Sequence, residues 1–185
     1  MLLIFTTGCT LINEPSDSIK EFVIQSEHVL PVKVRNERVT VHVVSDIPTD
    51  RPYIKMNTRV MKSIAGAQWH ESLPIMIEKT IAQNLQDAGF ATYRNLSAQG
   101  DIYMKITIRH FGLECYEKTK HHTGKKIHAA YFVEVYDKPR GRLAKSQLFE
   151  VFEDYEWVND EKYIESLNMR HEILVKRIYD WVFEE

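Results

Sequence analysis

Histidine, cysteine and carboxylate side chains are the groups in this sequence that could bind a metal or take part in catalysis. The chain of 185 residues contains eight histidines and two cysteines. No two histidines stand in an HExxH pattern, which would place both imidazoles on one face of a helix. The adjacent His121 and His122 lie in a lysine-rich segment, where neighbouring side chains point apart, so we interpret it as a solvated turn. The sequence therefore predicts no metal site and no bound cofactor.

Other candidate groups also have structural interpretations. His171 falls on the apolar stripe of a predicted helix, so we expect a core or boundary position. His70 follows Trp69 at a helix entry and has no visible partner. Cys115 lies within a predicted strand, and the sequence identifies no base that would activate its thiol.

The sequence contains none of the common catalytic motifs. Its carboxylates are scattered, so their spacing suggests no acid and base pair. The Walker A, GxGxxG and GxSxG patterns are missing. We therefore expect that the protein is not an enzyme and has no catalytic residue.

Composition and charge exclude several further classes. Apolar residues make up 44% and charged residues 27% of the chain, which is typical of a folded domain. The formal net charge is −2 without a basic block, so the cationic surface that binds nucleic acid is lacking. No apolar run approaches the roughly 20 residues that span a bilayer.

The first nine residues, MLLIFTTGC, resemble the end of a bacterial lipoprotein signal, whose cysteine is acylated and becomes the first mature residue. This interpretation makes Cys9 the lipidation site, and residues 1–20 a truncated signal remnant and tether. There is no basic region before the apolar run, which a start codon further upstream would explain, and Thr6 stands where an aliphatic residue is usual. The alternative is an ordinary apolar N-terminus with a buried cysteine. Residues 21–185 form a single predicted domain.

The segment from Gly66 to Phe90 is the clearest predicted helix. Ser72 can cap its first turn, where Pro74 is tolerated, and Gly89 can end it. The positions that form its apolar stripe are Leu73, Ile77, Ile81, Leu85 and Ala88.

Alternating apolar and polar residues predict the strands. The clearest is 38–45, and 101–116, 127–136 and 143–153 follow as an antiparallel meander around a polar turn at 118–126. Shorter strands are expected at 21–25, 32–36, 53–60 and 91–95. A closing helix capped by Asn159 or Asp160 has the core stripe Ile164, Leu167, His171, Leu174, Ile178 and Trp181. The predicted class is α/β, a mixed sheet of about five strands with two main amphipathic helices.

The order of these elements resembles the ABC-type transport auxiliary lipoproteins, including the paraquat-inducible C type, over residues 39–185. The residues that carry the resemblance are Ala67, Gln68, Trp69, Leu73, Pro74, Leu85 and Gly89. The resemblance implies a three-layer sandwich of the anticodon-binding-domain or TolB N-terminal type. It also implies a non-catalytic periplasmic lipoprotein of an MCE-type ABC lipid transport system, which docks an MCE-domain protein.

The acyl chains would anchor the protein to the outer membrane, with the inner membrane a less expected site. Members of this family can form rings, so a homo-oligomer is an open alternative. A second hypothesis is a stand-alone lipid-binding or ligand-binding lipoprotein, or an outer-membrane assembly factor; a hydrophobic cavity would favour it. For Trp69 the structural interpretation is a ring packed in the core, and the functional interpretation is a partner contact. The basic 118–126 segment could contact anionic lipid headgroups.

Overall fold

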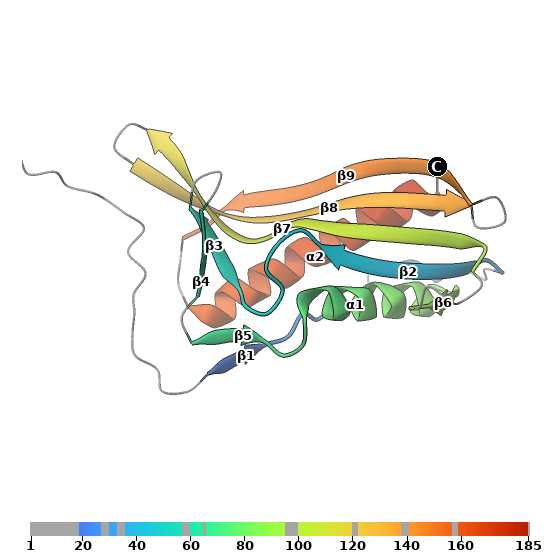
Figure 1. The fold of residues 1–185 in the computed structure, drawn as a ribbon, viewed down its shortest axis with the longest axis horizontal. Helices are drawn as coiled ribbons and strands as arrows, with labels where there is room; N and C mark the ends of the chain where they lie inside the picture. Colours follow the sequence, from blue (N-terminus) through green and yellow to red (C-terminus); the bar gives the residue numbers. More distant parts are fainter. Residues whose placement is uncertain are drawn as a thin grey trace, which may run out of the picture.

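The computed structural model describes residues 19–26, 30–32, 36–56, 60–64, 66–94, 100–119, 122–137, 141–156 and 159–184. Figure 1 shows the arrangement of their helices and strands. In chain order these elements are β1 (Lys20–Phe22), β2 (Arg38–Ser45), β3 (Tyr53–Met56), β4 (Val60–Ser63), β5 (Ala67–Trp69), α1 (Leu73–Asp87), β6 (Ala91–Tyr93), β7 (Ile102–Thr119), β8 (His122–Asp137), β9 (Arg142–Asp154) and α2 (Asp160–Phe183).

The long strand β7 is the centre of a seven-stranded mixed sheet. Along one edge it pairs with β8 in antiparallel register, and β9 follows β8. Along the other edge it pairs first with β2 and then, further along, with β3, both in parallel register. Strand β6 extends the sheet beside β2, and β4 extends it beside β3. The predicted meander of β7, β8 and β9 is confirmed.

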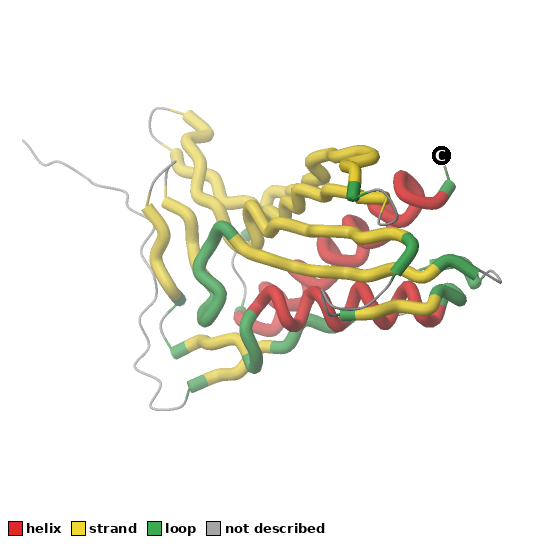
Figure 2. The backbone as a smooth tube through the Cα atoms, turned by 45° about the vertical axis from the view of Figure 1, so that its right-hand side comes forward, coloured by secondary structure: helices red, strands yellow, loops and turns green. Residues whose placement is uncertain are grey.

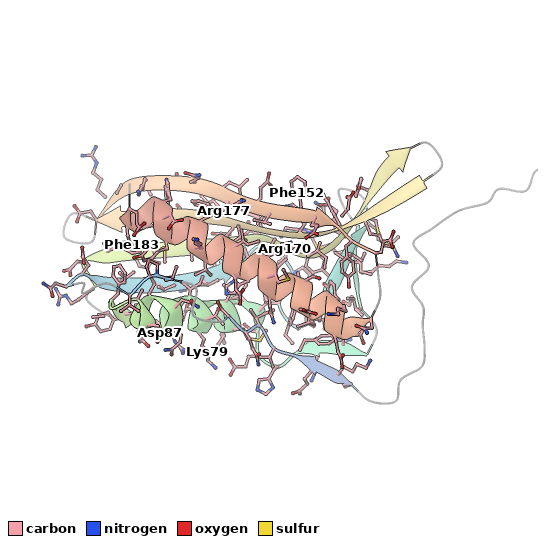
Figure 3. All side chains as sticks on the ribbon, turned by 180° about the vertical axis from the view of Figure 1, so that it is seen from behind. Lys79, Asp87, Phe152, Arg170, Arg177 and Phe183 are labelled. Carbon is pink, nitrogen blue, oxygen red and sulfur yellow. The ribbon has the colours of Figure 1, made fainter. Side chains whose placement is uncertain are left out.

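Both helices and the small sheet of β1 and β5 cover one face of the large sheet. Residues of α1, of α2 and Met104 of β7 line the same enclosed space, so the two helices share one core. Seen from behind, α2 lies across the sheet (Figure 3), and Figure 2 shows the helices beneath the strands. The predicted α/β class is confirmed. The seven-stranded mixed sheet, the small parallel sheet and the two helices are consistent with the α/β sandwich that the resemblance implied.

The predicted helix stripes are largely confirmed. The five stripe positions of α1 are 0–3% exposed. In α2, Leu167, His171, Leu174 and Ile178 are buried, whereas Ile164 and Trp181 are only partly buried. Neither helix among the described residues has the length and apolarity to cross a bilayer.

The first helix starts where the predicted cap places it, because Ser72 is the N-cap residue and α1 begins at Leu73. The residues before it differ from the prediction, since 67–69 form β5, which pairs with β1 in parallel. Ser72 occupies the N-cap position, but its side chain makes no capping hydrogen bond. Residues 67–69 are extended because β1, which is distant in sequence, supplies their hydrogen-bond partners. Gly89 ends the helix with a φ of 101°, as predicted.

Three other predictions have mixed outcomes. Asn159 caps α2, since its side chain accepts a hydrogen bond from the backbone N–H of Lys162. The segment 118–126 is not only a turn, because β7 continues to Thr119 and β8 begins at His122. A hairpin end can be polar in sequence and still keep its backbone pairing. Parts of the predicted 32–36 and 91–95 strands, and His121, lie outside the described residues.

His171 ties the two helices to the sheet through a buried chain of hydrogen bonds. The Thr80 hydroxyl of α1 donates to the carbonyl oxygen of Ile77 at 3.0 Å, so it accepts from Nε2–H of His171 at 2.6 Å. The other ring nitrogen, Nδ1, then accepts from the Tyr131 hydroxyl of β8 at 3.0 Å. Every polar atom of the imidazole is satisfied in its neutral form. Burial lowers the pKa of His171 to about 3.

We expect His171 to make the fold sensitive to acid. Its pKa is about 3 in the folded protein, against about 6.5 unfolded, so below pH 6.5 the unfolded chain binds a proton that the folded chain does not. Stability should fall as pH drops from 6.5 towards 3. His171→Gln should destabilise the protein most above pH 6.5, and the difference from wild type should shrink by roughly 2 kcal/mol at pH 5.

Urea unfolding at a series of pH values measures this difference. The control, His70→Gln, removes an exposed imidazole and should leave stability at neutral pH close to that of wild type. If the difference in unfolding free energy between His171→Gln and wild type stays constant with pH, His171 does not have the lowered pKa in the folded protein.

Candidate functional site

A β-bulge in the middle of β7 turns His110 away from the helices. Ile108 pairs with Tyr131 on the helix-facing side, and the register shifts before His110 pairs with Ala130. Arg109 is the extra residue, so the helix-facing positions continue at Phe111 instead of at His110. His110 therefore lies on the sheet face opposite the helices, which we call the outer face.

Three residues of metal-ligand type meet on this outer face. His110 and Glu114 lie on β7, and β8 places His128 opposite Gly112, between them. One ligand-type atom of each side chain lies within 4.8 Å of those of the other two, and the imidazole centroids are 4.4 Å apart. We call these three residues the His–Glu–His cluster. Gly112 is needed here, because a Cβ at this position would lie 2.8 Å from the carbonyl oxygen of Tyr53.

His110 is buried and held at one of its ring nitrogens. Its Nδ1 lies 3.1 Å from the hydroxyl oxygen of Tyr53, which also accepts the backbone N–H of Phe111 at 3.1 Å. Its Nε2 is buried and has no hydrogen-bond partner among the described residues. Burial, assisted by His128, lowers the pKa of His110 to about 3, so the imidazole is neutral near pH 7.

Glu114 is the ionised centre of the cluster. Its Oε1 lies 3.1 Å from Nζ of Lys55 on β3, and its Oε2 lies 3.4 Å from Nζ of Lys126 on β8. Oε2 also lies 3.0 Å from Nδ1 of His128. Burial raises the pKa of Glu114, but the hydrogen bonds from Lys55 and His128 outweigh this effect and lower the pKa to about 2.

His128 resembles His110 in having one engaged and one unengaged nitrogen. Its Nε2 is buried without a hydrogen-bond partner in the described part of the chain, although a carboxylate oxygen of Glu150 lies 3.6 Å away. The cluster thus combines two imidazole side chains with an ionised carboxylate. These are donor types of a transition-metal site.

Apolar side chains are exposed along β9, further across the same sheet. Leu143, Leu148 and Phe152 have 46%, 50% and 59% of their surface exposed, and we call them the β9 surface. Among the described strands β9 pairs only with β8, so it is an edge strand. Arg177 of α2 donates to the carbonyl oxygen of Glu150 at 3.2 Å, which satisfies one acceptor of this edge. Figure 3 labels Phe152 and Arg177.

Trp69 lies in the core and not on the surface. Its side chain is 4% exposed and packs against Phe22 of β1 and Phe111 of β7, with ring centroids 6.3 and 6.2 Å apart respectively. It thereby joins the small sheet to the large one. Its indole N–H has no hydrogen-bond partner among the described residues, whereas the structural interpretation expected a backbone carbonyl.

The remaining sequence-predicted groups are not brought into the cluster. His70 has a partner that the sequence did not reveal, because its Nδ1 lies 2.9 Å from Glu21. Cys9, the predicted lipidation site, lies outside the described residues. Cys115 is buried in β7.

The space between the helices and the sheet is small. A pocket lined by residues of α1, α2 and β7 encloses about 10 Å³, which is about the room that one water molecule needs. A lipid acyl chain does not fit in this pocket.

Comparisons with known proteins identify the fold. The chain is similar to protein XCC0632 of Xanthomonas campestris, of the family DUF330, with a TM-score of 0.70, 13% identity, and coverage of 89% of this chain and 95% of that one. An uncharacterised protein is similar with a TM-score of 0.64 and 11% identity, and the match covers 85% of this chain and 99% of that one. The hypothetical protein CT253 of Chlamydia trachomatis is similar with a TM-score of 0.50 and 11% identity, and the match covers 82% of this chain and 100% of that one. No family model and no curated protein matches the chain. At these identities the similarity concerns the fold alone.

The His–Glu–His cluster was missed by the sequence analysis, although one signal for it is visible. Buried apolar residues occupy even positions from Met104 to Ile108 and odd positions from Phe111 to Cys115. This change of phase indicates a bulge. His110 and Glu114, four residues apart on one strand, share a face, and the bulge turns that face away from the helices. The contribution of His128 depends on the β7–β8 register, which the sequence pattern does not specify.

We expect Trp69→Ala to destabilise the protein by about 3–5 kcal/mol, because it removes a large buried ring from the junction of the two sheets. Trp69→Phe should cost less, since it keeps part of the ring and removes the unpaired N–H. Urea unfolding measures both effects. Capture of an MCE-domain protein, measured at a temperature where both variants are folded, should be the same as for wild type. Capture that is lost while stability stays intact would instead make Trp69 a partner contact.

Proposed function

We propose that the chain is a non-catalytic, lipid-anchored accessory domain of an MCE-type ABC lipid transport system. In this role it docks an MCE-domain protein in the periplasm, with the outer membrane as its anchoring site. The observation that carries the proposal is the β9 surface, an exposed apolar row on an edge strand. The motif around Trp69 and the signal-like segment before Cys9 add support from the sequence.

The small size of the pocket between the helices and the sheet favours docking over lipid carriage. A stand-alone lipid carrier needs an apolar cavity that holds acyl chains, and such ligand pockets commonly measure about 300–1,000 Å³. The pocket between the helices and the sheet is far smaller, at about 10 Å³. Lipid that copurifies in a fixed ratio would favour the stand-alone carrier instead.

The β9 surface has the features of a protein-docking site. Unpaired backbone groups of an edge strand can bind a partner strand, and alternate side chains then supply specificity. Leu148 and Phe152 project from this strand, and exposed apolar rows of this kind are normally covered by a partner. Glu150 stands between them, half exposed, and could pair with a cationic side chain of that partner.

We expect mass spectrometry of the protein from its native host to find Cys9 as an acylated N-terminal residue. The protein should fractionate with the membrane, because several acyl chains together make the anchor effectively permanent. Cys9→Ser should release it into the soluble fraction. Since the sequence holds two cysteines, acylation of Cys9 excludes a disulfide between Cys9 and Cys115. An unmodified thiol, or that disulfide, would rule out the anchor.

We expect the double variant Leu148→Asp, Phe152→Asp to weaken binding to a purified MCE-domain protein from the same organism. Burying one large apolar side chain contributes about 1.5–3 kcal/mol, so the affinity should fall by at least about tenfold. Surface plasmon resonance with the soluble domain measures this change, and circular dichroism confirms the fold.

The matched control is Met169→Asp on α2, where the methionine is 51% exposed, close to the exposure of Leu148. It should bind as wild type does. Equal affinity for the β9 variant and wild type, or an equal loss for the control, would contradict docking through β9.

A further inference from the structure

We propose that His110, Glu114 and His128 form a binding site for a divalent transition-metal ion, for which Zn²⁺ is the suitable probe. The ion is held by Nε2 of His110, an imidazole nitrogen of His128 and a carboxylate oxygen of Glu114. This proposal does not depend on the proposed docking function.

The spacing of the donor atoms is close to that of a zinc site. Zinc binds imidazole nitrogen and carboxylate oxygen at about 2.0–2.2 Å, so neighbouring donors of a tetrahedral site lie about 3.3 Å apart. Here the three donors lie within 4.8 Å of one another. Small rotamer changes on a rigid pair of strands close the remaining gap. Three protein ligands leave a fourth position for water or another side chain.

The hydrogen bonds around His110 orient it as a ligand. An ion at Nε2 requires the tautomer with its proton on Nδ1, and in that tautomer Nδ1–H donates to the hydroxyl oxygen of Tyr53, 3.1 Å away. Ligating histidines commonly have their second nitrogen fixed by such an outer partner. The backbone N–H of Phe111 holds Tyr53 in turn, so this outer support is part of β7 itself.

The unengaged nitrogens are the observation that points to a ligand. Nε2 of His110 and Nε2 of His128 are both buried without hydrogen-bond partners in the described residues. Buried polar atoms of native proteins are normally paired, and each unpaired one needs an explanation. By contrast, both nitrogens of the buried His171 are engaged. A bound cation would give Nε2 of His110 its partner.

The two lysines beside Glu114 moderate the affinity. Lys55 and Lys126 neutralise the carboxylate, and a divalent ion must compete with them. Nζ of Lys126 lies 4.9 Å from the ring centroid of Phe152 and 5.7 Å from that of Tyr116, so it keeps two cation–π partners if it leaves Glu114. Removing this lysine should therefore strengthen metal binding.

Isothermal titration of the purified protein with Zn²⁺ tests the proposal, and Co²⁺ absorption reports the coordination. Wild type should bind one equivalent and give the intense bands of tetrahedral cobalt. His110→Gln and His128→Gln should each weaken binding by more than about 100-fold, since outer-shell changes alone cost 10–100-fold. Lys126→Met should tighten it by about tenfold.

The matched control is His70→Gln, which removes an imidazole that lies 2.9 Å from Glu21 at the surface, and should leave binding unchanged. If His110→Gln does not fold, His128→Gln decides, because that side chain is partly exposed. The proposal is overturned if wild type binds no zinc. It is equally overturned if binding persists in His128→Gln, which would place the ion on other histidines.

Discussion

The pairing of one edge of β7 with two successive parallel strands is the constraint on which the rest of the structure depends. Strand β2 occupies the first half of this edge and β3 the second half, while β8 runs along the other edge for almost the full length. The bulge at Arg109 lies between the two halves. It keeps apolar residues facing the helices in both, and it also turns His110 outwards. The core and the candidate site thus have a common origin.

The two faces of the sheet divide structural and chemical roles. The inner face packs against α1, α2 and the β1–β5 sheet, and its side chains form the hydrophobic core. The outer face is covered by no described helix, so it can carry charges: Glu114 with two lysines, and Lys105 with Glu134. Burial raises the pKa of Glu114, but the hydrogen bonds from Lys55 and His128 on this face outweigh that effect and lower it to about 2.

Sequence reasoning predicted those features whose cause is local. The stripe of α1, the glycine that ends it and the bounds of β2 follow from periodicity and capping within a few residues. The extended backbone at 67–69 could not be predicted, because its partner β1 lies more than 40 residues away in the sequence. The polar end of the β7–β8 hairpin was taken for a turn, since a strand made of polar residues lacks an apolar pattern. The His–Glu–His cluster needs a bulge, an inter-strand register and the position of Tyr53, none of which single-strand patterns specify.

The contrast between the two buried histidines separates architecture from chemistry. His171 donates through one nitrogen and accepts through the other, so its neutral form is complete and any further ligand would have to break a helix contact. His110 is equally buried, yet one nitrogen is unused. A purely structural role would be served as well by apolar side chains at His110 and Tyr53 together, since replacing both partners of a buried hydrogen bond by apolar groups can be nearly neutral. The unused nitrogen beside His128 and Glu114 is therefore more economically explained by an ion than by packing.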